Sequence, residues 1–200
     1  MARRGRIKGV NQMFNLEKNL ANILTLLNLC CGFIALRLIL VGRYTGAALM
    51  ILVAVILDCV DGKMARRFGA ASEIGKRLDP LCAMVSFGVV PATLAGVLAL
   101  TTPGWMMVVT GIIYTLASAY RMASYDSMEA PEGFIFGFPS TLCGAIIALL
   151  GIIAQRKMPT GIWALLLLVL SALMLSRLRL PKLPELHLPK NTGTKRNRRQ

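Results

Sequence analysis

Three aspartates stand out among the nine acidic residues of this chain. Asp58 and Asp61 lie three positions apart at the end of an apolar stretch, and Asp79 begins the next one. Residues three apart on a helix share one face, so the first two carboxylates project together. An acid at the edge of an apolar span is costly and is a functional candidate. Three such groups repel one another unless a cation lies between them, and their hard oxygens suit Mg²⁺ or Mn²⁺.

The residues between these acids suit a phosphate-bearing ligand. Gly62 permits a ligand to approach the helix backbone closely, and Arg66 can pair with a phosphate through two N–H groups. Ala65 keeps the surface between them low, while Ser72 and Gly75 lie in the following turn. The pattern predicts a metal-bridged phosphate or pyrophosphate site. Helix ends with snorkelling charges would explain the basic residues but not the acids.

The composition indicates which elements must position these residues. The chain has 200 residues, 56% hydrophobic and only 16% charged, with a formal net charge of +14. Strong basic charge is typical of nucleic-acid binders, but an average soluble protein is ~25% charged and far less apolar. The balance excludes a soluble globular domain and a chain that is as a whole a disordered basic segment. It also excludes a nucleic-acid partner. It predicts a membrane protein with basic flanks.

Six apolar segments approach the ~20 residues that a bilayer span needs, and all should be helices. They are 20–41, 45–57, 78–100, 105–123, 137–154 and 161–176. The second is short as an apolar run, and we expect its helix to continue past Asp58. The predicted fold is therefore an all-α polytopic integral membrane protein with six transmembrane helices. We expect a juxtamembrane segment at 1–19, a membrane domain at 20–180 and a basic tail at 181–200.

The basic residues predict the orientation of this domain. Nineteen belong to the N-terminal segment, the 62–77 connection, Arg121 and the tail from Arg177, against four on the opposite side. Such an excess marks the cytoplasmic side. Both termini and the acidic cluster are therefore expected at the cytoplasmic face.

The spacing of the chemical residues resembles a family signature. The chain reads Asp58-x-x-Asp61-Gly62-x-x-Ala65-Arg66, then eight residues, then Gly75-x-x-x-Asp79-x-x-x-Ala83. This resembles the CDP-alcohol phosphotransferase signature, D-x-x-D-G-x-x-A-R-x8-G-x-x-x-D-x-x-x-D, at every position except the last. Six transmembrane helices are also what that family would show.

Further segments resemble the branch of the family that synthesises phosphatidylserine from CDP-diacylglycerol. They are Ser86-Phe87-Gly88-x-x-Pro91-Ala92, Asn22-x-x-Thr25-x-x-Asn28-x-x-x-Gly32, Tyr120-Arg121 and Phe136-Gly137-Phe138-Pro139. Ser124 stands where a second arginine is expected in that branch.

The resemblance implies a lipid synthase that uses two divalent ions, Mg²⁺ or Mn²⁺. Serine would attack the phosphorus attached to diacylglycerol, and CMP would leave. The metal ligands would be Asp58, Asp61 and Asp79. Contacts to CDP-diacylglycerol would come from Thr25, Asn28, Gly62, Ala65, Arg66, Ser72 and Gly75. Arg121 could hold the serine carboxylate. The resemblance also implies a homodimer in a prokaryotic cytoplasmic membrane.

Ala83 departs from the signature, because the family has an aspartate there that ligates metal and is the proposed base for the acceptor hydroxyl. An alanine can do neither. We therefore expect this chain to bind CDP-diacylglycerol but to be inactive or severely impaired, since loss of a general base typically costs ~10²–10⁴-fold. The alanine could be an introduced inactivating substitution or a natural loss.

Three other interpretations of the residues are open. The acceptor could be glycerol phosphate, inositol phosphate or choline. The three aspartates could line a divalent-cation transporter, although they lie at one membrane face and not at its midplane. The chain could also be a non-catalytic membrane anchor whose basic tail binds anionic lipid.

Overall fold

The computed structural model describes residues 2–68, 73–99, 104–127, 134–136, 138–154, 158–176 and 179–181. Its helices are α1 (Ala2–Leu40), α2 (Tyr44–Phe68), α3 (Glu73–Ala83), α4 (Val90–Leu98), α5 (Gly104–Ser127), α6 (Ser140–Ala154) and α7 (Thr160–Leu175), with a π-helical turn, η1 (Met84–Val89), between α3 and α4. Two three-residue strands, β1 (Phe134–Phe136) and β2 (Arg179–Pro181), pair antiparallel. The predicted all-α class is confirmed, and most of the expected basic tail at 181–200 lies outside the described residues.

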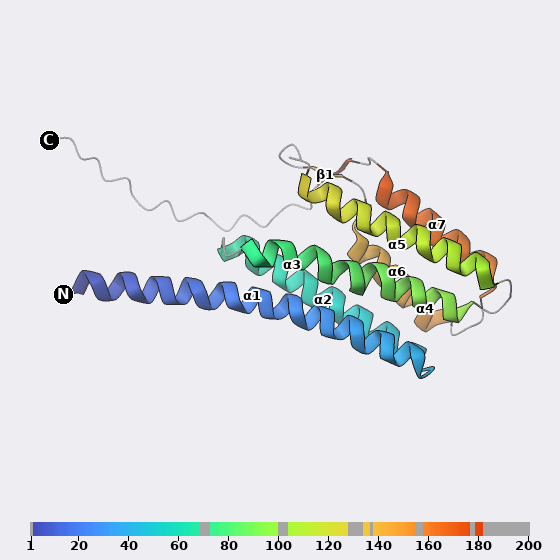
Figure 1. Ribbon diagram of the computed structural model, residues 1–200, viewed down its shortest axis with the longest axis horizontal. Helices are drawn as coiled ribbons and strands as arrows, with labels where there is room; N and C mark the ends of the chain where they lie inside the picture. The colour runs from blue at the N-terminus through green and yellow to red at the C-terminus, as the bar shows by residue number, and fades with distance from the viewer. Residues whose placement is uncertain are drawn as a thin grey trace.

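The helices lie side by side with roughly parallel axes (Figure 1). In that view α1 and α2 form one side of the bundle, α5 and α7 form the other, and the α3–α4 rod runs between them. The N-terminal part of α1 projects beyond the bundle, at the end where α2 finishes and α3 begins. At this end of the bundle, α1 therefore lies beside the end of α2 and the start of α3.

Four helical segments are long and apolar enough to cross a membrane. They are Asn22–Leu40, Tyr44–Met64, Arg77–Leu98 and Gly104–Ser124, and two shorter apolar helices cover Ser140–Ala154 and Thr160–Leu175. These six segments agree with the six predicted ones. The expected extension of the second helix past Asp58 is confirmed, because α2 continues to Phe68.

The burial pattern is that of a protein surrounded by lipid. Large apolar side chains such as Phe33, Ile56 and Leu116 are exposed, whereas Asn28, Ser86 and other polar groups are buried between helices. Lipid tails are as apolar as leucine, so helices associate in a membrane by close packing and interhelical hydrogen bonds. Gly32 shows this packing, because a Cβ there would lie 2.6 Å from the Oγ of Ser86.

The α3–η1–α4 rod changes its helical geometry in the middle of the bundle. Pro91 follows η1 and carries no N–H, so it cannot bond the carbonyl of Phe87 one turn earlier. The hydroxyl of Tyr114 on α5 donates to that carbonyl at 3.0 Å. Tyr114 and Phe87 are both fully buried. The hydrogen bond from Tyr114 on α5 thus stabilises η1. This π-turn connects α3, which carries Asp79, to the buried helix α4.

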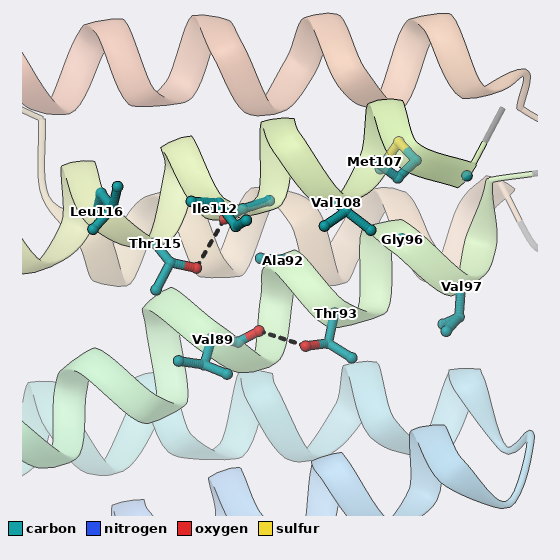
Figure 2. Close-up of a pocket in the computed structure, with 12 residues that line it drawn as sticks. Val89, Ala92, Thr93, Gly96, Val97, Met107, Val108, Ile112, Thr115 and Leu116 are labelled. Atoms are coloured by element: carbon teal, nitrogen blue, oxygen red, sulfur yellow. Dashed lines mark hydrogen bonds between the residues drawn. The ribbon is translucent and has the colours of Figure 1, made fainter.

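An apolar groove lies between α4 and α5 (Figure 2). It has a volume of about 490 Å³ and begins at Val89, ten positions beyond Asp79. The hydroxyls of Thr93 and Thr115 in its wall each donate to a carbonyl one turn back in their own helix, both at 2.9 Å. The groove therefore offers mainly hydrocarbon surface.

Candidate active site

The three predicted aspartates come together where α2 ends and α3 begins. One carboxylate oxygen from each of Asp58, Asp61 and Asp79 lies within 4.8 Å of the others. Asp61 is buried, Asp58 is half-buried and Asp79 is exposed. The i, i+3 spacing on α2 places the first two on one face, and α3 returns along the bundle to supply the third. The sequence-based grouping of these acids is confirmed by the structure.

Two threonines from different helices hold the α2 carboxylates. Thr25 on α1 donates from Oγ1 to Oδ2 of Asp61 at 3.2 Å. Thr141 on α6 donates from Oγ1 to Oδ2 of Asp58 at 3.0 Å. An ionised carboxylate has about four acceptor sites, so each aspartate keeps capacity for another ligand. Thr25 was predicted to contact CDP-diacylglycerol, and the structure places it against a carboxylate of the cluster.

Gly62 leaves open space beside Asp61. A Cβ built at Gly62 meets no heavy atom of the described residues within 4 Å, apart from its own helix backbone and chain neighbours. Packing within the described part of the chain therefore does not require a glycine at this position. The open space supports the expectation that a ligand approaches the backbone here.

The other predicted contacts to CDP-diacylglycerol lie on several elements. Asn28 is buried between helices, where its Nδ2 donates to the carbonyl of Ala54 at 3.3 Å, and its ligand role stays a prediction. Gly75 lies on α3, one turn before Asp79, and not in the connecting turn where the sequence placed it, because α3 already begins at Glu73. Ala65 and Arg66 lie on the last turns of α2, but their side chains are outside the described part of the chain, as is Ser72 altogether.

Ala83 lies one turn after Asp79 and is 8% exposed. It packs with Ala54, which is one turn before Asp58 on α2, and with Phe87. The last position of the signature thus lies just beneath the aspartate cluster, between α2 and α3. A carboxylate at this position would extend the cluster toward the interior of the bundle, and alanine supplies no such group.

Arg121 reaches the same region from α5. Its guanidinium NH1 donates to Oγ of Ser140 at 3.1 Å, and Ser140 is the first residue of α6. The next residue, Thr141, holds Asp58. The predicted acceptor residue and the aspartate cluster are therefore linked through one helical turn.

Sequence reasoning missed Ser140 and Thr141. They follow the Phe138-Pro139 turn and begin an apolar helix, which is a place where serine and threonine occur simply as capping residues. Their contacts are with residues 19 and 83 positions away. The hydroxyl pair directly after the turn was the only available signal.

The donor set fits a divalent metal ion. All three clustered side chains are carboxylates, which are the hard oxygen donors that Mg²⁺ and Mn²⁺ prefer. Their crowding within 4.8 Å is costly without a cation, because like charges at this separation repel. The nearby open space at Gly62 leaves room for phosphate oxygens that such ions also bind.

Apolar helices with three clustered carboxylates at one end of the bundle fit a metal-dependent membrane enzyme. The profile of the CDP-alcohol phosphatidyltransferase family matches residues 18–175, so the chain belongs to that family.

Within the family, the chain is similar to proteins named CDP-diacylglycerol–serine O-phosphatidyltransferase. The Bacillus subtilis protein is 28% identical over 128 residues, which cover 64% of this chain and 72% of the relative. The Mycobacterium leprae protein is 30% identical over 186 residues, covering 85% and 60%. The Methanocaldococcus jannaschii protein is 32% identical over 174 residues, covering 86% and 79%.

Proposed function

We propose that this protein is of the type that transfers the phosphatidyl group of CDP-diacylglycerol to L-serine with release of CMP, and that Ala83 limits its own turnover. The observation that carries the proposal is the convergence of Asp58, Asp61 and Asp79 at one end of the bundle, on the positions of the family signature. The relatives named for this reaction share most of the chain. A carboxylate cluster at a membrane edge suits a substrate that has a soluble head and lipid tails.

The aspartates would hold two divalent ions, Mg²⁺ or Mn²⁺, which when bound neutralise the pyrophosphate and stabilise attacking and leaving oxygens. Gly62 leaves room for the phosphates, and the signature position of Arg66 would supply a guanidinium to pair with them. The serine hydroxyl oxygen forms a bond to the phosphorus that carries diacylglycerol. The bond from this phosphorus to the CMP oxygen breaks, and the hydroxyl proton passes to a base.

Arg121 is the proposed contact for the acceptor carboxylate. Its position next to Ser140, which adjoins the residue that holds Asp58, supports an acceptor bound close to the aspartate cluster. A guanidinium recognises a carboxylate through two parallel hydrogen bonds. A guanidinium also pairs with phosphate, so this contact favours serine over the cationic acceptor choline, and the acceptor assay has to separate serine from glycerol phosphate and inositol phosphate.

The residue at position 83 determines whether the chain catalyses the transfer. Ala83 offers neither the ligand nor the base that the signature has there, so we propose that the chain binds CDP-diacylglycerol with little or no transfer. Restoration of a carboxylate by Ala83→Asp should raise serine-dependent CMP release by ~10²–10⁴-fold.

The test measures CMP release from CDP-diacylglycerol in mixed micelles with Mn²⁺, for the chain and for Ala83→Asp. Serine, glycerol phosphate, inositol phosphate and choline are offered separately. We expect release only with serine and only in the substituted protein. Equal rates in the two proteins would contradict the role given to position 83, and release with another acceptor would replace serine.

Orientation and assembly stay predictions. The excess of basic residues on one side supports cytoplasmic termini and a cytoplasmic site. A homodimer and a prokaryotic cytoplasmic membrane are expected from the family resemblance. A transporter that uses the same aspartates predicts Mn²⁺ flux into liposomes that contain the protein, whereas the proposed enzyme predicts none.

A further inference from the structure

The first turn of α6 connects two parts of the site. Thr141 donates to Oδ2 of Asp58 at 3.0 Å, and its neighbour Ser140 accepts a hydrogen bond from Arg121 at 3.1 Å. Ser140 is 1% exposed. One rigid helical turn therefore contacts a side chain of α2 and a side chain of α5.

The hydrogen bond of Thr141 differs from those of other membrane threonines in this chain. Thr93, Thr110 and Thr115 each donate to a carbonyl one turn back in their own helix, at 2.9 Å. Thr141 reaches a carboxylate on another helix. A threonine hydroxyl has one hydrogen to donate, and Thr141 gives it to Asp58. Rotation of the Asp58 carboxylate would break this hydrogen bond, so the bond restricts that rotation.

Thr25 applies the same restraint to Asp61 from the opposite neighbour, α1. The two carboxylates of α2 are thus held from two sides, with their oxygens close to Asp79. Partners of this kind orient metal ligands, and their loss typically costs ~10–100-fold in metal affinity.

We propose that Thr141 is a positioning residue for the metal site, which fixes the Asp58 carboxylate in the orientation that binds the ion. This inference rests on the metal site of the proposed function. It concerns binding of the ion itself and does not depend on which alcohol is the acceptor.

The experiment is a Mn²⁺ titration of the full-length protein in detergent, followed by the electron paramagnetic resonance signal of free Mn²⁺, without substrates. Thr141→Val removes the hydroxyl at nearly constant volume and should weaken Mn²⁺ binding ~10–100-fold. Thr141→Ser keeps the hydroxyl and should bind Mn²⁺ nearly as the unchanged protein does. Thr115→Val makes the same chemical change in the α4–α5 groove and should leave the affinity unchanged.

Equal affinity of Thr141→Val and the unchanged protein overturns the proposal, while the metal site of the proposed function stands. Equal weakening in Thr141→Val and Thr141→Ser also overturns it, because packing of the methyl group would then be responsible. If Thr141→Val does not fold, the same comparison is made with Thr141→Ala. If the unchanged protein does not bind Mn²⁺, the same variants are compared on the Ala83→Asp background, and failure of Ala83→Asp to bind Mn²⁺ removes both the metal site and the inference.

Discussion

The aspartate cluster and the α4–α5 groove use similar residues for different purposes. Thr25 and Thr141 donate across helix boundaries to carboxylates, whereas Thr93 and Thr115 in the groove donate within their own helices. The first pair stabilises charges near the end of the bundle. The hydroxyls of the second pair are hydrogen-bonded to backbone carbonyls of their own helices, so the groove remains mainly apolar. The partner of each hydroxyl, and not the residue type, distinguishes a reactive region from a lipid-compatible one.

The glycines divide in a similar way. Gly32 lies in the packed interior, where a Cβ would come within 2.6 Å of the Oγ of Ser86. Gly62 lies beside Asp61, where a Cβ would meet no other described residue within 4 Å. The first glycine is required by the packing of α1 against η1, and the second leaves space beside an aspartate of the cluster, where a ligand could approach. Substitutions in each region should therefore fail for different reasons.

The largest effect is expected for Asp61→Asn in the cluster. The asparagine carbonyl can still accept the hydrogen bond from Thr25, so folding should be retained, but the charge that attracts the ion is lost. Because a supporting residue alone costs ~10–100-fold in metal affinity, removal of a ligand should exceed about 100-fold. A Mn²⁺ titration measures the effect. An unchanged affinity with normal thermal unfolding would mean that the cluster does not bind metal.

Gly62→Ala should reduce transfer without harming the fold. Alanine is favoured over glycine in a helix by up to about 1 kcal/mol, and the site has room for the added methyl group. The methyl group would displace a bound phosphate, and a 1 Å misplacement can lower the rate on the order of 10²-fold. CMP release is compared on the Ala83→Asp background. Gly161→Ala, which also has open space around its Cβ, is the matched control and should keep full activity.

Gly32→Ala should show the opposite behaviour, with a smaller effect that appears in stability. The new Cβ must displace Ser86, and overpacking of this kind typically costs about 1–3 kcal/mol. Thermal unfolding in detergent should therefore occur at a lower temperature than for Gly161→Ala. Unfolding at the same temperature as that control would show that α1 and η1 can separate at little cost.

Much of the fold and the grouping of the three aspartates could be predicted from residue order alone. A bilayer requires long apolar helices, so the spans follow from local composition. Asp58 and Asp61 share a helix face through local geometry, and Asp79 begins the next span of the same hairpin. The charge bias likewise predicts which face is cytoplasmic. These conclusions depend on residues that are close in sequence or on averages over segments.

Only the tertiary structure placed Thr141 on Asp58, Ser140 on Arg121 and the Tyr114 hydroxyl on the carbonyl of Phe87. Each contact joins helices whose rotation and depth are set by packing, which local patterns do not encode. In the sequence, Gly32 and Gly62 look alike, since each is a single glycine in a helix. Only the packing of the neighbouring helices makes one site crowded and the other open. The sequence determined the spans and the chemistry of the acids, and helix packing decided which side chains hold those acids in place.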